Sequence, residues 1–202
     1  MTLLRFALAP VFALVLAVPA MAGALSLDQI STYLNGLETA QADFLQVNAD
    51  GSTAKGVLYI KRPGRVRFEY ATDKTLVMAS GGQVAIFDPK SNQPAEQYPL
   101  ARTPLNLILA PKVDLGRAKM VVGRESDATT TTIVAQDPDH PEYGTIRLVF
   151  TDAPVALKQW IITDDSGAKT AVVLSGLKTG VGGGGGGGGK NTPAEPPHDG
   201  AR

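Results

Sequence analysis

The sequence of 202 residues contains no cysteine and only two histidines. Without cysteine there are no disulfides, no thiolate metal ligands, no thiol nucleophile and no cysteine to carry an acyl anchor. One histidine, His198, falls in a Pro-rich C-terminal stretch, which leaves His140 as the single histidine in the main part of the chain. No serine lies in the strand-to-helix setting of a hydrolase nucleophile. We therefore expect that this protein is not an enzyme.

An excess of charge of either sign is also missing, because 19 Lys and Arg stand against 19 Asp and Glu. Such a chain is not expected to bind nucleic acid or to bind anionic membranes tightly through charge. The one segment with metal-ligand chemistry is 137–142, Asp-Pro-Asp-His-Pro-Glu, and its two prolines are more typical of a solvated hairpin loop. We expect no bound metal and no cofactor.

Long apolar runs are restricted to the N-terminus. Arg5 precedes an apolar stretch at 6–18, and Ala-Met-Ala at 20–22 is a small-residue cleavage site, which is the pattern of a secretory signal peptide. The stretch is shorter than the roughly 18 residues usual for a membrane span. We predict that residues 1–22 are cleaved and that the exported chain, with 18 basic and 19 acidic residues left, resides in the periplasm.

The C-terminus is dominated by an unbroken glycine run, 182–189, followed by a polar, Pro-rich end. This composition cannot build a core and predicts a disordered tail over 180–202. The run leads into Lys190 and superficially mimics a phosphate-binding loop, but Asn191 replaces the required Ser or Thr and no helix pattern follows. Residues 23–179 are therefore expected to form one domain.

Side-chain alternation is abundant, and it is clearest in Gly-Val-Leu-Tyr-Ile-Lys-Arg-Pro-Gly-Arg-Val-Arg-Phe-Glu-Tyr at 56–70. Two runs of period two flank a Pro-Gly turn, and the first has apolar side chains on both faces, so we expect both faces to be covered. Regular spacing and tight turns predict one curved or closed antiparallel sheet. Its predicted strands are about 41–47, 55–62, 65–71, 75–80, 83–88, 118–124, 129–136, 144–151, 156–164 and 168–176.

Two short helices are predicted beside the strands. A capping box at Ser26 and Gln29 opens the first, over about 28–39. The second, 103–110, is apolar nearly all round, so it must fill the core or cover something apolar, and the pattern leaves both interpretations open. With no catalytic chemistry, an exported sheet with apolar helices suggests a container for an apolar ligand.

Four segments in order carry a family resemblance: Asp43-Phe44-x-Gln46, the Lys-Arg-Pro turn with its flanking strands at 56–70, the strand 84–88, and Thr103-Pro104-Leu105. From about residue 26 to 178 the chain resembles the LolA-type periplasmic lipoprotein carriers. The resemblance implies a mainly β fold in which one curved antiparallel sheet of about 10–11 strands forms an incomplete barrel. Short helices would lid an apolar cavity, and the protein would be a monomer.

The resemblance also implies a function and partners. Family members accept lipoproteins from an inner-membrane ABC transporter of the LolCDE type, shield their acyl chains across the periplasm and deliver them to an outer-membrane receptor. Two alternatives on the same fold stay open: a binding protein for a free lipid or glycolipid, and a sensor or scaffold without lipid cargo. Family members usually continue past the last strand into a further apolar segment, where this chain has glycines.

Residue roles come from the resemblance as well. It implies that Arg62, in the Lys-Arg-Pro turn, hydrogen-bonds backbone carbonyls near Ile108 and Leu109 and holds the lid shut. The lid helix then comprises Thr103, Pro104, Leu105, Ile108 and Leu109. The side chains expected to line the acyl-binding cavity, with facing that depends on register, are Leu58, Ile60, Phe68, Met78, Phe87, Leu148 and Trp160.

Overall fold

A computed structural model describes residues 23–117 and 119–181. The predicted signal peptide, 1–22, and the part of the predicted tail from 182 onward lie outside the described residues. Over the two described ranges, no helix combines the length and the apolar character that crossing a bilayer requires.

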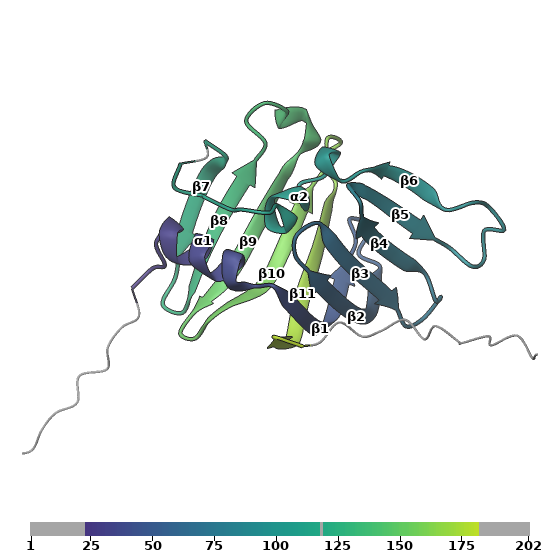
Figure 1. Ribbon diagram of the computed structural model, residues 1–202, viewed down its shortest axis with the longest axis horizontal. Coiled ribbons are helices and arrows are strands. Elements are labelled where there is room, and N and C mark those ends of the chain that lie inside the picture. The colour runs from purple at the N-terminus through teal and green to yellow at the C-terminus, as the bar shows by residue number, and fades with distance from the viewer. Residues whose placement is uncertain (1–22, 118, 182–202) are drawn as a thin grey trace, which may run out of the picture.

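The described residues form one antiparallel sheet of eleven strands in the order β6-β5-β4-β3-β2-β1-β11-β10-β9-β8-β7 (Figure 1). The predicted fold class is confirmed, and each predicted strand is present within a few residues. β6 was not predicted from the sequence. The strands are β1 (Thr39–Val47), β2 (Thr53–Lys61), β3 (Arg65–Tyr70), β4 (Leu76–Ser80), β5 (Gln83–Phe87), β6 (Glu96–Pro99), β7 (Val121–Ser126), β8 (Thr130–Gln136), β9 (Thr145–Asp152), β10 (Val155–Thr163) and β11 (Lys169–Thr179).

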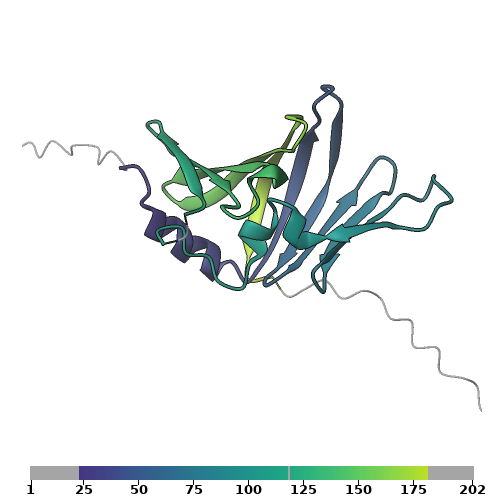
Figure 2. The same cartoon turned by 90° about the horizontal axis from the view of Figure 1, so that it is seen from above.

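The sheet is strongly curved, and both helices lie inside its curve (Figures 1 and 2). The first strand pairs with the last, so β1 and β11 sit in the middle and two sets of hairpins extend from them. β6 and β7 are the two edges, which leaves the barrel incomplete. Because side chains alternate along each strand, the concave face collects the core, as in β9 with Ile146, Leu148 and Phe150.

The expectation that both faces of the 55–62 strand are covered is wrong. On the convex face of β2, Val57 and Tyr59 are half-buried, and neither helix of the described ranges lies on that side. Neighbouring side chains of β3 partly cover this face. Arg67 lies directly opposite Tyr59 and forms an ion pair with Glu69 at 2.5 Å. Long cationic side chains can shield apolar surface with their stems while the charged group stays in water.

Helix α1 (Leu27–Gly36) begins where the capping box predicts. The Ser26 hydroxyl accepts from the Gln29 amide at 3.1 Å, and the Gln29 side-chain carbonyl accepts from the Ser26 amide at 2.8 Å. The helix ends before the predicted residue 39, because β1 already starts at Thr39 and uses that backbone for pairing with Lys61 of β2.

Helix α2 (Asn106–Leu109) is shorter than the predicted 103–110 and follows a 3-10 turn, Leu100–Arg102. Thr103 is not its N-cap: the Thr103 hydroxyl donates backwards to the Leu100 carbonyl at 2.8 Å. The Leu100 carbonyl accepts from the Thr103 amide at 3.0 Å as well, so the hydroxyl is used on the preceding turn instead of the helix start. Pro104 stays in the turn before the helix.

Candidate functional site

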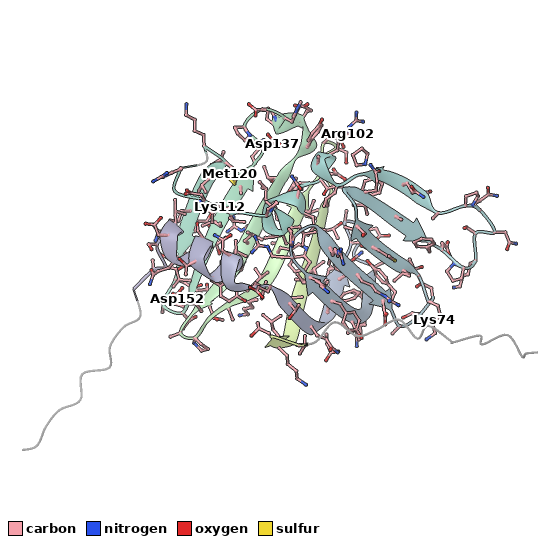
Figure 3. All side chains as sticks on the ribbon, viewed as in Figure 1. Lys74, Arg102, Lys112, Met120, Asp137 and Asp152 are labelled. Atoms are coloured by element: carbon pink, nitrogen blue, oxygen red, sulfur yellow. The ribbon has the colours of Figure 1, made fainter. Side chains whose placement is uncertain are left out.

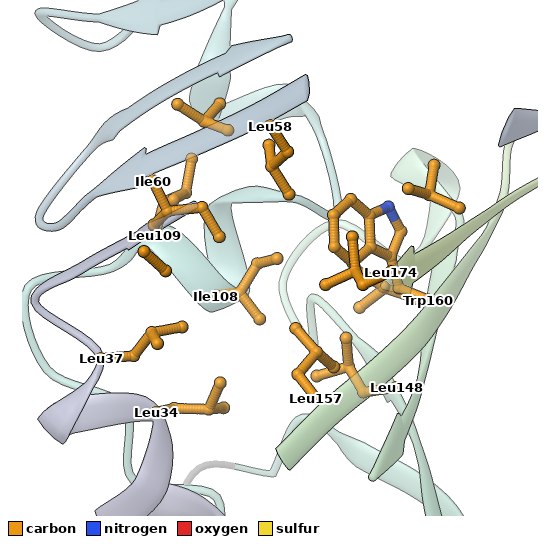
Figure 4. Close-up of a cluster of buried hydrophobic side chains, with 14 of the residues drawn as sticks. Leu34, Leu37, Leu58, Ile60, Ile108, Leu109, Leu148, Leu157, Trp160 and Leu174 are labelled. Atoms are coloured by element: carbon orange, nitrogen blue, oxygen red, sulfur yellow. The ribbon is translucent and has the colours of Figure 1, made fainter. Parts of the chain in front are cut away.

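The concave face and the two helices form one apolar cluster (Figure 4). Ile108 and Leu109 of α2 point into it beside Leu34 and Leu37, which lie on α1 and just after it. Trp160 of β10 is only 1% exposed. The predicted cavity residues that are buried on this face are Leu58, Ile60, Phe68, Leu148 and Trp160. The lid side chains therefore occupy the concave face directly.

Two predicted cavity residues are wrong. Met78 pairs with Arg67 across β3 and β4, which places it on the convex face, whereas Val77 pairs with Phe68 on the concave face. Phe87 pairs with the convex-face residue Leu76 and is 44% exposed. In each strand the predicted residue is one position away from a residue on the concave face, and a shift of one position moves a side chain to the other face of a sheet.

Arg62 connects the β2–β3 turn to the lid. Its Nη2 donates to the Ala110 carbonyl at 2.6 Å and lies 3.5 Å from the Asn35 side-chain carbonyl. The guanidinium is half-buried, and this desolvation lowers the pKa of Arg62 from its ordinary value, although an arginine keeps its proton in a protein. Its Nε is buried without a hydrogen-bond partner among the described residues. The residue thus faces the lid and is partly open to solvent.

A second hydrogen bond joins the same two elements. The Gly64 amide donates to the Leu109 carbonyl at 2.9 Å. Gly64 has a φ of 69°, a backbone region that favours glycine, so the turn can present this amide to the lid without strain. In the lid, the Ala110 carbonyl therefore accepts from Arg62, and the Leu109 carbonyl accepts from Gly64. The expectation that Ile108 and Leu109 would accept from Arg62 is corrected accordingly.

Gly56, the first residue of the 56–70 segment, permits close packing between β2 and its neighbouring strands. A Cβ at Gly56 would lie 2.0 Å from the Glu69 carbonyl oxygen and 2.7 Å from the Phe44 ring. Phe44 packs edge-on against Phe68 at 5.4 Å and against Tyr70 at 5.1 Å between ring centroids. The segment therefore holds an aromatic cluster beneath the β1–β3 strands.

The lid segment, residues 100–115, is fastened to α1. The Asn35 side chain donates to the Val113 carbonyl at 2.7 Å and accepts from the Val113 amide at 2.9 Å. The Ser31 hydroxyl accepts from the Leu115 amide at 3.0 Å. Asn35 and Ser31 were not predicted as functional, because a polar residue in a helix gives no signal of a partner some eighty residues away in the chain.

Helix α1 is in turn fastened to the sheet at β7–β10. The Leu25 amide, just before the helix, donates to the Thr131 hydroxyl at 2.9 Å, and Thr131 donates to Asp152 at 2.7 Å. Arg124 donates to the Leu25 carbonyl. The Tyr33 hydroxyl accepts from the Leu157 amide at 3.0 Å, and burial raises the pKa of Tyr33. These bonds tie α1 and the lid segment to one side of the sheet.

An open groove of about 490 Å³ lies beside the start of the lid segment. It runs between β4–β6 and β10, which lie in opposite halves of the sheet, and Thr103, Pro104 and Leu105 of the predicted lid line it. Its other lining residues are Val77, Val84, Tyr98, Arg102, Glu142, Tyr143, Ile162, Asp164 and Asp165. At this groove Val77, Leu105 and Ile162, which pack against the buried core, reach the surface.

The 137–142 segment forms the loop between β8 and β9, as predicted. His140 lies 3.0 Å from Glu142 and stacks on Tyr143. No group of three or more His, Cys, Asp or Glu within residues 23–117 and 119–181 is arranged to hold a metal ion.

A family model described as "Outer membrane lipoprotein carrier protein LolA" matches residues 35–181. The chain belongs to the LolA family. This confirms the resemblance carried by the Lys-Arg-Pro turn. The match covers the Arg62 turn, the lid segment and the sheet. At the level of the family, it supports a lipoprotein carrier and not an enzyme.

Curated relatives carry the same description. An outer-membrane lipoprotein carrier protein of Azotobacter vinelandii is 27% identical over 169 residues, covering 79% of this chain and 81% of the relative. One from Coxiella burnetii is 30% identical over 134 residues, covering 61% and 63%. Among solved structures, a LolA superfamily protein from Nitrosomonas europaea has a TM-score of 0.41 and 10% identity, covering 77% of this chain and 94% of that one.

Proposed function

We propose that this protein carries lipoproteins through the periplasm by enclosing their acyl chains between the curved sheet and the lid. The observation that supports this most is the hydrogen bond from Arg62 to Ala110, which holds the lid segment over an apolar concave face. Cargo would come from an inner-membrane ABC transporter of the LolCDE type and pass to an outer-membrane receptor. The physical need is large, because exposing a 16-carbon chain to water costs on the order of 12 kcal/mol.

The closed lid gives the carrier a way to release its cargo. In the closed state Ile108 and Leu109 fill the concave face, so acyl chains and lid side chains compete for the same surface. Entering chains have to displace the lid from the β2–β3 turn and break the Arg62 and Gly64 bonds. Closure then opposes occupancy and favours transfer to a receptor that binds the chains more strongly.

Binding is tested directly with the purified chain from residue 23 onward and a triacylated lipoprotein. We expect a soluble one-to-one complex and uptake of an apolar dye that the lipoprotein displaces. The proposal fails if neither forms. Copurification of a free glycolipid from native membranes, without lipoprotein binding, would favour the alternative cargo.

The lid contact is tested by Arg62→Leu. A hydrogen bond from a charged group contributes about 1.5 kcal/mol at the lower end of its range. Its loss should therefore shift the closed-to-open ratio by about tenfold. We expect the variant to accept lipoprotein and to transfer it to the receptor about tenfold more slowly. Arg65→Leu is the matched control, because Arg65 follows the same turn as the first residue of β3, is exposed and has no hydrogen bond to a lid carbonyl within the described ranges. Equal transfer by both variants would contradict the role of Arg62.

A further inference from the structure

The groove beside Leu105 combines an apolar floor with a charged rim. Val77, Val84 and Ile162 supply side chains from the two halves of the sheet, and Leu105 supplies one from the lid segment. Val77 and Ile162 also pack against the buried core. The floor of the groove is thus continuous with the interior that the proposed acyl chains would occupy.

The rim carries three carboxylates, Glu142, Asp164 and Asp165, against one guanidinium, Arg102. Hydrogen bonds, first from the Ser166 hydroxyl, hold the pKa of Asp164 below its ordinary value. The pKa of Glu142 is also lowered, by its own backbone amide and then by His140. These groups stay ionised at neutral pH, so the rim has an excess of negative charge although the whole chain is balanced.

Other charges gather at the same end of the molecule. Asp137 lies near Arg102 in Figure 3, and it lines a smaller hollow together with Thr103 and Pro104 of the lid segment. Its carboxylate accepts from the amides of Asp139 and His140 and so is held in the loop beside the groove. The β8–β9 loop and the β10–β11 turn together make this end acidic.

We propose that this acidic rim selects lipoproteins whose polypeptide carries lysine or arginine directly after the lipid-bearing residue. The inference rests on the proposed function. Acyl chains lie on apolar surface, so the polypeptide attached to them has to leave where that surface ends, past Glu142, Asp164 and Asp165. A cationic segment there gains attraction to the rim, and an acidic segment is repelled.

The expected effect is modest, because all three carboxylates are exposed to water. An exposed ion pair changes an affinity by roughly 1.5- to fivefold. Two or three such pairs should give about a tenfold preference for a lysine-rich segment at low salt. Screening should remove most of this preference at high salt, where the Debye length falls to about 3 Å.

The test uses three synthetic peptides with one identical triacylated N-terminal residue and a lysine-rich, serine-rich or glutamate-rich segment after it. Binding to the chain from residue 23 onward is measured by fluorescence at low and high salt. Asp165→Lys is the main variant, because the Asp165 side chain makes no hydrogen bond within the described ranges. The Asp164 carboxylate, in contrast, accepts hydrogen bonds that hold the β10–β11 turn. Asp43→Lys, the same change on an exposed position of β1 away from the groove, is the matched control.

We expect the wild type to bind the lysine-rich peptide most tightly and the glutamate-rich peptide most weakly, with the three affinities converging at high salt. Asp165→Lys should remove or reverse that order, and Asp43→Lys should keep it. Equal binding of all three at low salt would overturn the rim proposal and leave the carrier function standing. If no lipidated peptide binds, the carrier function itself is contradicted. Equal binding of an unlipidated lysine-rich peptide would also overturn the proposal, because the rim would then act without the groove.

Discussion

The two ends of the sheet are packed very differently. In β8 and β9, Ile133, Ala135, Ile146 and Phe150 are completely buried. At the other end the cover thins strand by strand, until Tyr98 of β6 is 38% exposed on the rim of the groove. The lid segment follows this division, since Asn35 and Ser31 fasten residues 113–115 to α1 and so towards β7–β10. On the other side the Leu100 amide bonds Gly82 of the β4–β5 turn, and Leu109 and Ala110 bond the β2–β3 turn. We expect from this difference that one end supplies stability and that the proposed opening takes place at the other.

The largest effect expected from this comparison concerns two phenylalanines. Phe150→Ala should destabilise the protein by about 3–5 kcal/mol, because a fully buried aromatic ring leaves a cavity. Phe87→Ala should cost less than about 1 kcal/mol, since Phe87 is on the convex face and 44% exposed. Urea denaturation of both variants measures the difference. Similar losses would show that the two ends contribute equally to stability.

A smaller effect is expected at the bond network that anchors α1. Thr131→Val keeps the shape of a fully buried side chain but leaves the Leu25 amide and the Asp152 carboxylate without their partner. Unpaired buried polar groups cost about 1–3 kcal/mol, so we expect a loss of stability in that range. Thr132→Val, the next residue on β8, forms the control, because its side chain faces the other way and we expect a change below about 1 kcal/mol. Calorimetry that shows equal changes would contradict the anchoring role.

Sequence patterns predicted the architecture well where the physical signal was local. The capping box fixed the start of α1, and alternation with tight turns predicted ten of the strands within a few residues. β6 gave no such signal, because Glu96–Pro99 does not alternate between apolar and polar residues and becomes a strand only by pairing with β5. Strand existence was therefore easier to predict than strand pairing.

The site was predictable only in part. The Lys-Arg-Pro turn identified Arg62, but the carbonyl it contacts depends on where α2 ends, and the chain just after α2 is held at Val113 by Asn35 of α1, far away in the sequence. The facing of Met78 was not predictable, because Leu76, Val77 and Met78 are all apolar and show no alternation. Only the register with β3 decides which of them faces inward.

The last effect appears only at high pH and concerns the aromatic rings that close part of the thinner end. Burial raises the pKa of Tyr70 to about 12 from an ordinary 10.0, with a further contribution from Asp73. The folded state therefore holds this proton more tightly than the unfolded state, and stability should fall as pH rises from 10 towards 12. Spectrophotometric titration should show a late-ionising tyrosine that Tyr70→Phe lacks. Ordinary titration of every tyrosine would mean that this cluster is open to water.

The central claim is that the lid stays with β7–β10 and separates from the β2–β3 turn when acyl chains enter. The absence of cysteine allows spin labels to be placed at chosen pairs of exposed sites. One pair, Arg65→Cys with Lys112→Cys, reports the turn and the lid segment, and a second, Thr32→Cys with Lys158→Cys, reports α1 and β10. On binding a triacylated peptide, the first distance should lengthen and the second should stay constant. A constant first distance, or a lengthening of the second, would contradict the account.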